Sequence, residues 1–340
     1  MAMLFSLLSS SAAASPAPDA SSSALVLNTH DATTHTIVSH HKSGTFAAFA
    51  MLGSCCCSEA AEDFWSTWSI CSSECERKDW WLCNNGLHSG PWSIKMSGQK
   101  CTPNRNVGQF TNFIRHPVDV VVSGYLYHRS CNEAASKPIA NGVLFVSSAE
   151  AADEMRKLLG ASKNDPRSYC DLLQSNSATA GIEAELVRTM SSENGLAPML
   201  RDFDTLEAAH AAGTAVLRTV CLASVTPGVA GADASWKNIT GSLGCRDVNA
   251  ETEEQTHEHH STSADSLDRS RDELRSMAKL AILARFTDEE KQTMDRIATL
   301  CPVESTATAR LQLARTHGLS TKARAHEELK AAENFYDEWA

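Results

Sequence analysis

Short apolar runs alternate with helix-like segments along most of the chain, and this alternation predicts an α/β protein. The strand-like runs are rich in β-branched or aromatic residues and cover residues 36–38, 111–114 and 215–225. Helices are predicted over residues 46–52, 118–128, 149–159 and 168–190. The last part of the chain is predicted to be helical, over residues 265–286 and 288–300 and in two further helices from Thr306.

One of these helices has an ambiguous composition. Residues 118–128 contain the run V-D-V-V-V, which by itself favours a strand. Pro117 stands directly before the run, and proline is favoured in the first turn of a helix. We therefore predict a helix that begins near Pro117, after a strand that ends before Arg115.

The chain divides into three regions by composition. Residues 1–33 are rich in Ser and Ala and predict a disordered tail or a weak targeting segment. Residues 34–250 contain the alternating pattern, and residues 251–340 open with an acidic, His-rich loop and continue as helices that pack on or extend the domain. Within the middle region, residues 55–99 hold most of the tryptophans, and their Gly and Pro content predicts loops with short helices that line a pocket.

Charge and hydropathy exclude some classes of partner. The formal net charge of −11 argues against a nucleic-acid partner, although a local basic pocket is compatible with it. No apolar run approaches the roughly 20 residues that a membrane-spanning helix needs, so we expect no transmembrane segment.

The chain contains twelve cysteines, three of them consecutive at residues 55–57. No C-x-x-C pair is present to suggest a zinc site, so no metal is expected. Disulfide frameworks are typical of short secreted domains, and this chain is long. We therefore expect mostly reduced thiols, with some disulfides as the alternative.

The segment from His35 to Leu52 has the composition of a strand, a polar loop and the start of a helix. Such a loop binds anions because backbone N–H groups and the positive end of the helix dipole converge on it, and Lys42 adds a full charge. Lys42 precedes Gly44, whereas the lysine of a Walker A loop follows its glycines, so a metal-dependent nucleotidase loop is a poor match. Taken alone, the segment is equally compatible with an ordinary turn that carries a surface lysine.

A second stretch, F-I-R-H-P-V-D-V-V-V-S-G-Y at residues 113–125, changes this interpretation. Together with H-K-S-G-T at residues 41–45, it resembles the two nucleotide-binding signatures of the sulfotransferases, which take a sulfonate group from 3′-phosphoadenosine 5′-phosphosulfate (PAPS). The family signatures are close to P-K-S-G-T-T-W and R-[DN]-P-x-D-x-x-x-S-x-Y. Five positions of the second signature fall in place: Arg115, Pro117, Asp119, Ser123 and Tyr125.

A weaker match lies downstream. S-W-K-N-I-T at residues 235–240 looks like the family's G-D-W-K-N-x-F-T segment, which implies that Trp236 and Lys237 contact the nucleotide. The R-K-G loop that precedes this segment in the family is absent, and C-L-A-S at residues 221–224 stands where the family often has an acidic Y-E-D-L.

The resemblance implies a P-loop-like parallel sheet with helices on both faces and a donor site at its carboxyl edge. Ser43, Gly44 and Thr45 would surround the 5′-phosphosulfate, next to Phe46, which replaces the family's second Thr. Arg115 and Ser123 would bind the 3′-phosphate. Lys42 would neutralise the bridging oxygen as it leaves, without a metal.

The catalytic base and the adenine site are less defined. His88 stands roughly where some sulfotransferases place a catalytic His, and the acidic residues of the segment after the loop helix are the alternatives: Glu59, Glu62 and Asp63. Ala47 stands where the family often has a Trp that stacks on adenine, so Phe49 or Tyr169 is expected to substitute.

These features together predict a PAPS-dependent sulfotransferase that acts on a hydroxyl or amine of a small molecule or saccharide. A non-catalytic binding module of the same fold and a phosphoryl-transfer enzyme are the alternatives. A cytoplasmic location is expected, with the secretory pathway or a plastid as alternatives, and the Asn238-Ile239-Thr240 glycosylation sequon is meaningful only in the secretory pathway.

Overall fold

Four parallel strands form one sheet in the order β2-β1-β3-β4. The computed structural model describes residues 35–56, 80–83, 108–131, 146, 148–192, 194–226, 229, 231–245 and 270–302. The strands are β1 (His35–Val38), β2 (Trp80–Cys83), β3 (Gly108–Ile114) and β4 (Ala215–Cys221). The predicted α/β class and parallel sheet are confirmed. The prediction of loops and short helices around Trp80 is wrong, because W-W-L-C forms the edge strand β2.

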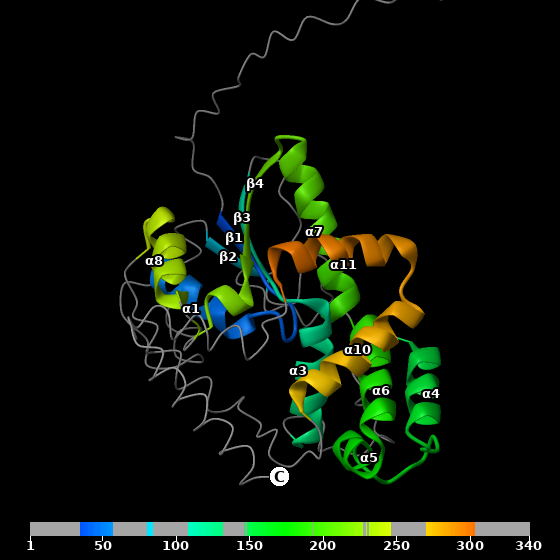
Figure 1. Ribbon diagram of the computed structural model, residues 1–340. Helices are drawn as coiled ribbons and strands as arrows, with labels where there is room; N and C mark the ends of the chain where they lie inside the picture. The colour runs from blue at the N-terminus through cyan, green and yellow to red at the C-terminus, as the bar shows by residue number, and fades with distance from the viewer. Residues whose placement is uncertain are drawn as a thin grey trace, which may run out of the picture. The chain divides into compact units, whose positions relative to one another are not determined.

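Helices connect and cover the strands (Figure 1). They are α1 (Thr45–Cys56), α3 (Pro117–Arg129), α4 (Ala149–Leu158), α5 (Tyr169–Ser175), α6 (Ala178–Ser191), α7 (Leu196–Ala211), the 3-10 helix η3 (Leu222–Ser224), α8 (Ala232–Ser242), α10 (Arg271–Arg285) and α11 (Asp288–Leu300). The helix predicted over residues 168–190 is two helices, because Ser177 caps the start of α6. The helices predicted from Thr306 lie outside the described residues.

The two faces of the sheet bury different side chains. Ile37 and Phe113 pack in a cluster with α1 and with Trp236 of α8, whereas Val38 and Phe110 pack with Leu206 of α7. Successive side chains of a strand point to opposite faces, so α1 and α8 cover one face and α7 covers the other (Figure 1). Helices on both faces were predicted, and the described part of the sheet confirms this.

The helix α3 settles the ambiguity of the valine run. His116 accepts a hydrogen bond from the Val118 N–H through its side chain, and Pro117 occupies the first turn, so the helix begins where predicted. The valines are buried in a cluster shared with α4, α6, α7, α10 and α11. Burial on a helical core therefore outweighs the strand preference of valine at this position.

Disulfides link segments that are far apart in the sequence. Cys55 is bonded to Cys245, Cys131 to Cys170 and Cys221 to Cys301, with Cα–Cα distances of 4.1, 5.0 and 5.1 Å. Every described cysteine is disulfide-bonded, so the expectation of mostly reduced thiols is wrong. The sequence separations of 190, 39 and 80 residues explain why no local spacing revealed the pairs.

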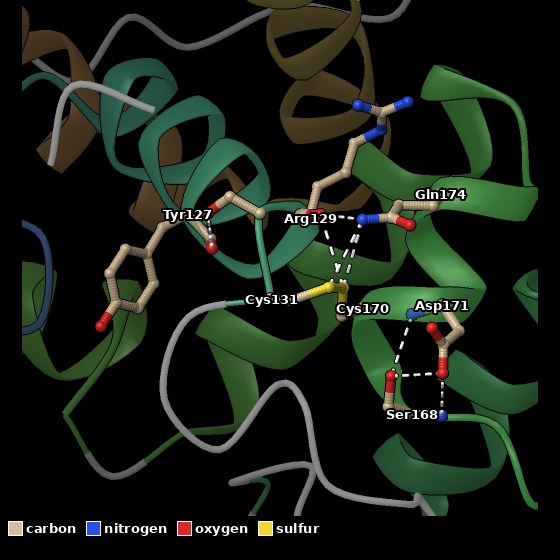
Figure 2. Close-up of a disulfide and its surroundings, with 8 residues drawn as sticks. Tyr127, Arg129, Cys131, Ser168, Cys170, Asp171 and Gln174 are labelled. Carbon is tan, nitrogen blue, oxygen red and sulfur yellow. Dashed lines mark hydrogen bonds between the residues drawn. A yellow bond between two sulfur atoms is a disulfide. The ribbon is translucent and has the colours of Figure 1, made fainter. Parts of the chain in front are cut away.

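Figure 2 shows the disulfide that joins the end of α3 to α5. The Gln174 side-chain amide donates to the Arg129 carbonyl at 2.9 Å and lies 3.4 Å from each sulfur of the Cys131–Cys170 bond. A capping box between Ser168 and Asp171 begins α5 beside it. The start of α5 is thus held both by its own cap and by a covalent link to α3.

Across the helices that the structure describes, none is long and apolar enough to cross a membrane.

Candidate functional site

The candidate site lies at the carboxyl ends of β1 and β3, which are neighbours in the sheet. After β1 the chain continues into α1, which packs on one face of the sheet. After β3 it continues into α3, which packs in a different cluster, together with Ile114 and α7. Adjacent strands whose connections diverge in this way form a switch point, where open α/β sheets bind ligands.

The loop after β1 has an unusual backbone conformation. Lys42 has a φ of 64° and Gly44 a φ of 124°, both in the region that side chains disfavour. A Cβ on Gly44 would lie 3.2 Å from Leu222 Cδ1 and 3.3 Å from Phe113, so only glycine fits the space as well as the φ. The loop therefore turns sharply and delivers the chain into α1, whose first N–H groups have no acceptor within the helix.

Hydrogen bonds to His40 fix this turn. The Ser43 hydroxyl accepts from the His40 N–H at 2.8 Å and donates to the His40 carbonyl at 3.0 Å. The same carbonyl accepts from the Ser43 N–H at 3.0 Å and from the Thr45 hydroxyl at 3.2 Å. The groups of Ser43 and Thr45 that were expected to contact a ligand thus bond within the loop. The backbone amides at the start of α1 are left as its donors toward an anion.

The loop is also fixed from the side of α7. His40 Nε2 and Asp202 Oδ2 are 2.9 Å apart, and both side chains are fully buried. The His41 N–H donates to the Asn194 carbonyl at 2.8 Å. These contacts hold the turn against α7 and against the residues that precede it.

The two predicted signatures meet at this edge. Arg115 Nη1 donates to the Lys42 carbonyl at 3.2 Å, across a sequence separation of 73 residues. The Lys42 ammonium lies 2.9 Å from the ring centroid of Tyr127 on α3. Ser123 is half-buried one helical turn before Tyr127, and so it lies on the same side of α3. Lys42 and Arg115 are therefore brought together beside α3, and Ser123 shares a helical face with the Tyr127 ring that Lys42 contacts.

The electrostatics of this edge are cationic. Burial lowers the pKa of Arg115 to about 10; Asp119 opposes this, and the positive charges of Arg271 and Arg275 add to it. Arg115 therefore stays protonated at neutral pH. Burial also lowers the pKa of His116, so that side chain is neutral at pH 7.

A buried polar network contacts the loop through His41. The His41 ring stacks on the His128 ring with centroids 5.8 Å apart, and His128 Nδ1 is 3.1 Å from Glu185 Oε2. Glu185 accepts hydrogen bonds from the Tyr169 hydroxyl at 3.0 Å and from Arg188 at 2.9 and 2.7 Å. This carboxylate packs so closely on Gly124 that no Cβ would fit there.

The other predicted site residues are not gathered at this edge. Trp236 is 3% exposed and packs in the core beside α1, whereas Lys237 is exposed on α8. The proposal that Phe49 or Tyr169 stacks on adenine is wrong, because they are 3% and 2% exposed and offer no free ring face. The predicted bases lie outside the described residues, as does the side chain of Phe46: His88, Glu59, Glu62 and Asp63.

Two features of the site are not predicted from the sequence: the aromatic ring beside Lys42 and the arginines of α10. Tyr127 could have been found, because it lies four residues after Ser123 and so shares its helical face. Arg271 and Arg275 could not, because they follow the two signatures by more than a hundred residues in a segment with no matching motif.

Comparison with protein-family models, with curated proteins and with solved structures finds no match to this chain.

Proposed function

We propose that this protein is a PAPS-dependent sulfotransferase that transfers a sulfonate group to a hydroxyl or amine of a small molecule or saccharide. The observation that carries the proposal is the hydrogen bond from Arg115 to the Lys42 carbonyl. It joins the two segments that resemble the family signatures, at the edge of the sheet where a nucleotide would bind.

The residues at this edge suit the chemistry. The acceptor oxygen or nitrogen forms a bond to sulfur, the bond from sulfur to the bridging oxygen breaks, and adenosine 3′,5′-bisphosphate and a proton are released. Negative charge grows on the bridging oxygen, and Lys42 would neutralise it. The amides at the start of α1 would bind the 5′-phosphate, and Arg115 the 3′-phosphate. His88 remains the proposed base.

A non-catalytic nucleotide-binding module is the second candidate. The Lys42 ammonium lies on the Tyr127 ring, and the Ser43 and Thr45 hydroxyls bond to His40. Both features would suit a loop that binds an anion through its backbone alone.

The disulfides bear on the compartment. Disulfides persist in oxidising compartments and are rare in the cytosol. The three pairs therefore support the secretory pathway rather than the cytoplasm as the place where this protein folds. An exposed Asn238 in the glycosylation sequon agrees with this proposal.

Calorimetric titration with adenosine 3′,5′-bisphosphate, in the absence of metal, tests the donor site. We expect binding that is at least about tenfold tighter than that of 5′-AMP, and a loss of this preference in Arg115→Ala. Arg285→Ala is the control, because Arg285 pairs with Glu154 away from the site. Equal binding of the two nucleotides by the unaltered protein would contradict the proposal.

Turnover separates the candidates. Sulfonated product from a panel of acceptors with PAPS supports the transferase. Tight nucleotide binding without turnover supports the binding module, and Mg²⁺-dependent transfer from ATP supports the phosphoryl-transfer alternative.

A further inference from the structure

Three arginines from distant parts of the chain converge beside Asp119. Arg115 follows β3, and Arg271 and Arg275 lie four residues apart on α10, so they share one face of that helix. Arg275 Nε donates to Asp119 Oδ1 at 2.7 Å, across 156 residues of sequence. This bond holds the first turns of α10 and α3 together, and the two helices are in contact.

Among the residues that the structure describes, the positive charges at this point outnumber the negative ones. Asp119 is the less exposed carboxylate of the group, and its side chain is 13% exposed. Asp272 also pairs with Arg275, at 3.1 Å, but its side chain is 65% exposed and faces solvent. Arg271 is exposed and forms no ion pair within the described part of the chain. The local excess of positive charge is notable in a protein whose formal net charge is −11.

The charges of these side chains act on one another. Burial lowers the pKa of Arg115 most, Asp119 opposes this, and the positive charges of Arg271 and Arg275 lower it further. Partial desolvation and the charge of Arg275 lower the pKa of Arg271, and Asp119 again opposes the shift. The bond from Arg275 to Asp119 brings the start of α10, with Arg271, to the start of α3, which Arg115 precedes by two residues. Arginine binds phosphate through two parallel N–H donors, so arginines placed at these two helix starts suit a phosphate monoester.

We infer that Arg271 on α10 joins Arg115 to bind a phosphate monoester group, with Arg275 positioning α10 through its bond to Asp119. The inference rests on the proposed function, within which this group is the 3′-phosphate of the donor. It assigns a binding role to the helical C-terminal part of the chain, which the resemblance does not cover. It also supplies a cation where the R-K-G loop is missing.

The test compares Arg271→Ala with Arg285→Ala, which alters the last turn of the same helix. Adenosine 3′,5′-bisphosphate and 5′-AMP are titrated into each protein by calorimetry. We expect Arg271→Ala to bind the bisphosphate about tenfold more weakly and 5′-AMP unchanged, because it loses charge-assisted bonds to the 3′-phosphate alone. Arg285→Ala should match the unaltered protein.

Two outcomes separate the inference from the proposed function. Bisphosphate binding that is the same in Arg271→Ala and in the unaltered protein would overturn the inference and leave the proposed function intact. If the unaltered protein binds neither nucleotide, the proposed function fails, and inorganic phosphate then decides the inference. Thermal stabilisation by phosphate that Arg271→Ala lacks would support an anion site; equal stabilisation, or none, would overturn it.

Discussion

The Lys42 ammonium lies 2.9 Å from the ring centroid of Tyr127, so the positive charge of the loop after β1 is in contact with a side chain of α3. A cation over an aromatic face is attracted by its quadrupole, and the attraction strengthens as water is excluded. Tyr127 is 6% exposed, so this contact is largely shielded from solvent. Lys42 is thereby kept at the edge of the sheet instead of extending into water.

Lys42→Ala should abolish most transfer while largely preserving nucleotide binding. The loop amides and Arg115 would still hold the phosphates, but the leaving oxygen would lose its cation. We expect kcat to fall by about 10² to 10³. The measurement is product formation from PAPS alongside calorimetry, with Lys291→Ala on α11 as the control. Normal turnover by Lys42→Ala would refute the mechanism.

Tyr127 is expected to act through its ring. Tyr127→Phe keeps the aromatic face and should retain near-normal kcat, whereas Tyr127→Leu removes it and should lower kcat by about tenfold, because Lys42 is no longer positioned. Steady-state kinetics on the two variants test this. Equal kcat values for Phe and Leu would show that the ring has no positioning role.

Gly44→Ala should destabilise the fold. The substitution combines a φ of 124° with a Cβ only 3.2 to 3.3 Å from Leu222 and Phe113. We expect a loss of about 1–3 kcal/mol in the free energy of unfolding, measured by urea denaturation. Gly241→Ala is the matched control: a Cβ there meets nothing within 4 Å, so alanine should stabilise helix α8 by about 0.5–1 kcal/mol.

Glu185 should make stability depend on acid pH. Burial alone would raise the pKa of this carboxyl, but Arg188 and His128 outweigh it and lower the pKa from 4.5 to about 2. A lowered folded-state pKa means that the carboxylate contributes stability above about pH 4.5, and that this contribution is lost as the pH falls toward 2. Urea unfolding between pH 2.5 and 6 should show this decline.

Glu185→Gln is the variant that isolates this effect. It should lose about 3–5 kcal/mol at pH 7, because Arg188 stays buried without its partner, and its stability should vary less below pH 4.5. Glu183→Gln on the same helix should behave like the unaltered protein, since Glu183 forms no ion pair with the described residues. An unaltered pH profile in Glu185→Gln would contradict the prediction.

The disulfides should be found in protein made in an oxidising compartment. Peptide mapping without reductant should recover the pairs Cys55–Cys245, Cys131–Cys170 and Cys221–Cys301. Loss of one native pair should cost about 2–5 kcal/mol, so mild reduction should lower the urea midpoint. Complete alkylation of these cysteines without reductant would contradict the pairing.

Local patterns predicted the elements that surround the loop. The sequence predicts β1, β3 and α3 because the signals for them are local. Composition marks the two strands, Gly44 marks the loop after β1, and Pro117 marks the start of α3. The helix α7 was missed although its apolar residues follow a helical period, with Leu196, Met199 and Phe203 all buried. β2 was missed because its Trp/Cys-rich segment was interpreted as loop.

The parts that sequence could not predict depend on tertiary contacts. The Cys55–Cys245 pair spans 190 residues, and Arg275 reaches Asp119 across 156. The prediction that Phe49 or Tyr169 stacks on adenine is wrong because both rings are buried. A position in a motif does not reveal which way a ring faces. The roles of Lys42, Arg115 and Ser123 in nucleotide binding remain predictions.

The bond between Arg275 and Asp119 also constrains how the protein matures. Asp119 leaves the ribosome early, whereas its partner is synthesised 156 residues later, and Cys301, which pairs with Cys221, emerges later still. A nascent chain that stops before α10 leaves the valines of α3 without the apolar surface of Leu274 and Ile282. The apolar cluster around α3 can therefore be completed only after α10 has been synthesised, and a product truncated before α10 should be retained by chaperones rather than released in a folded form.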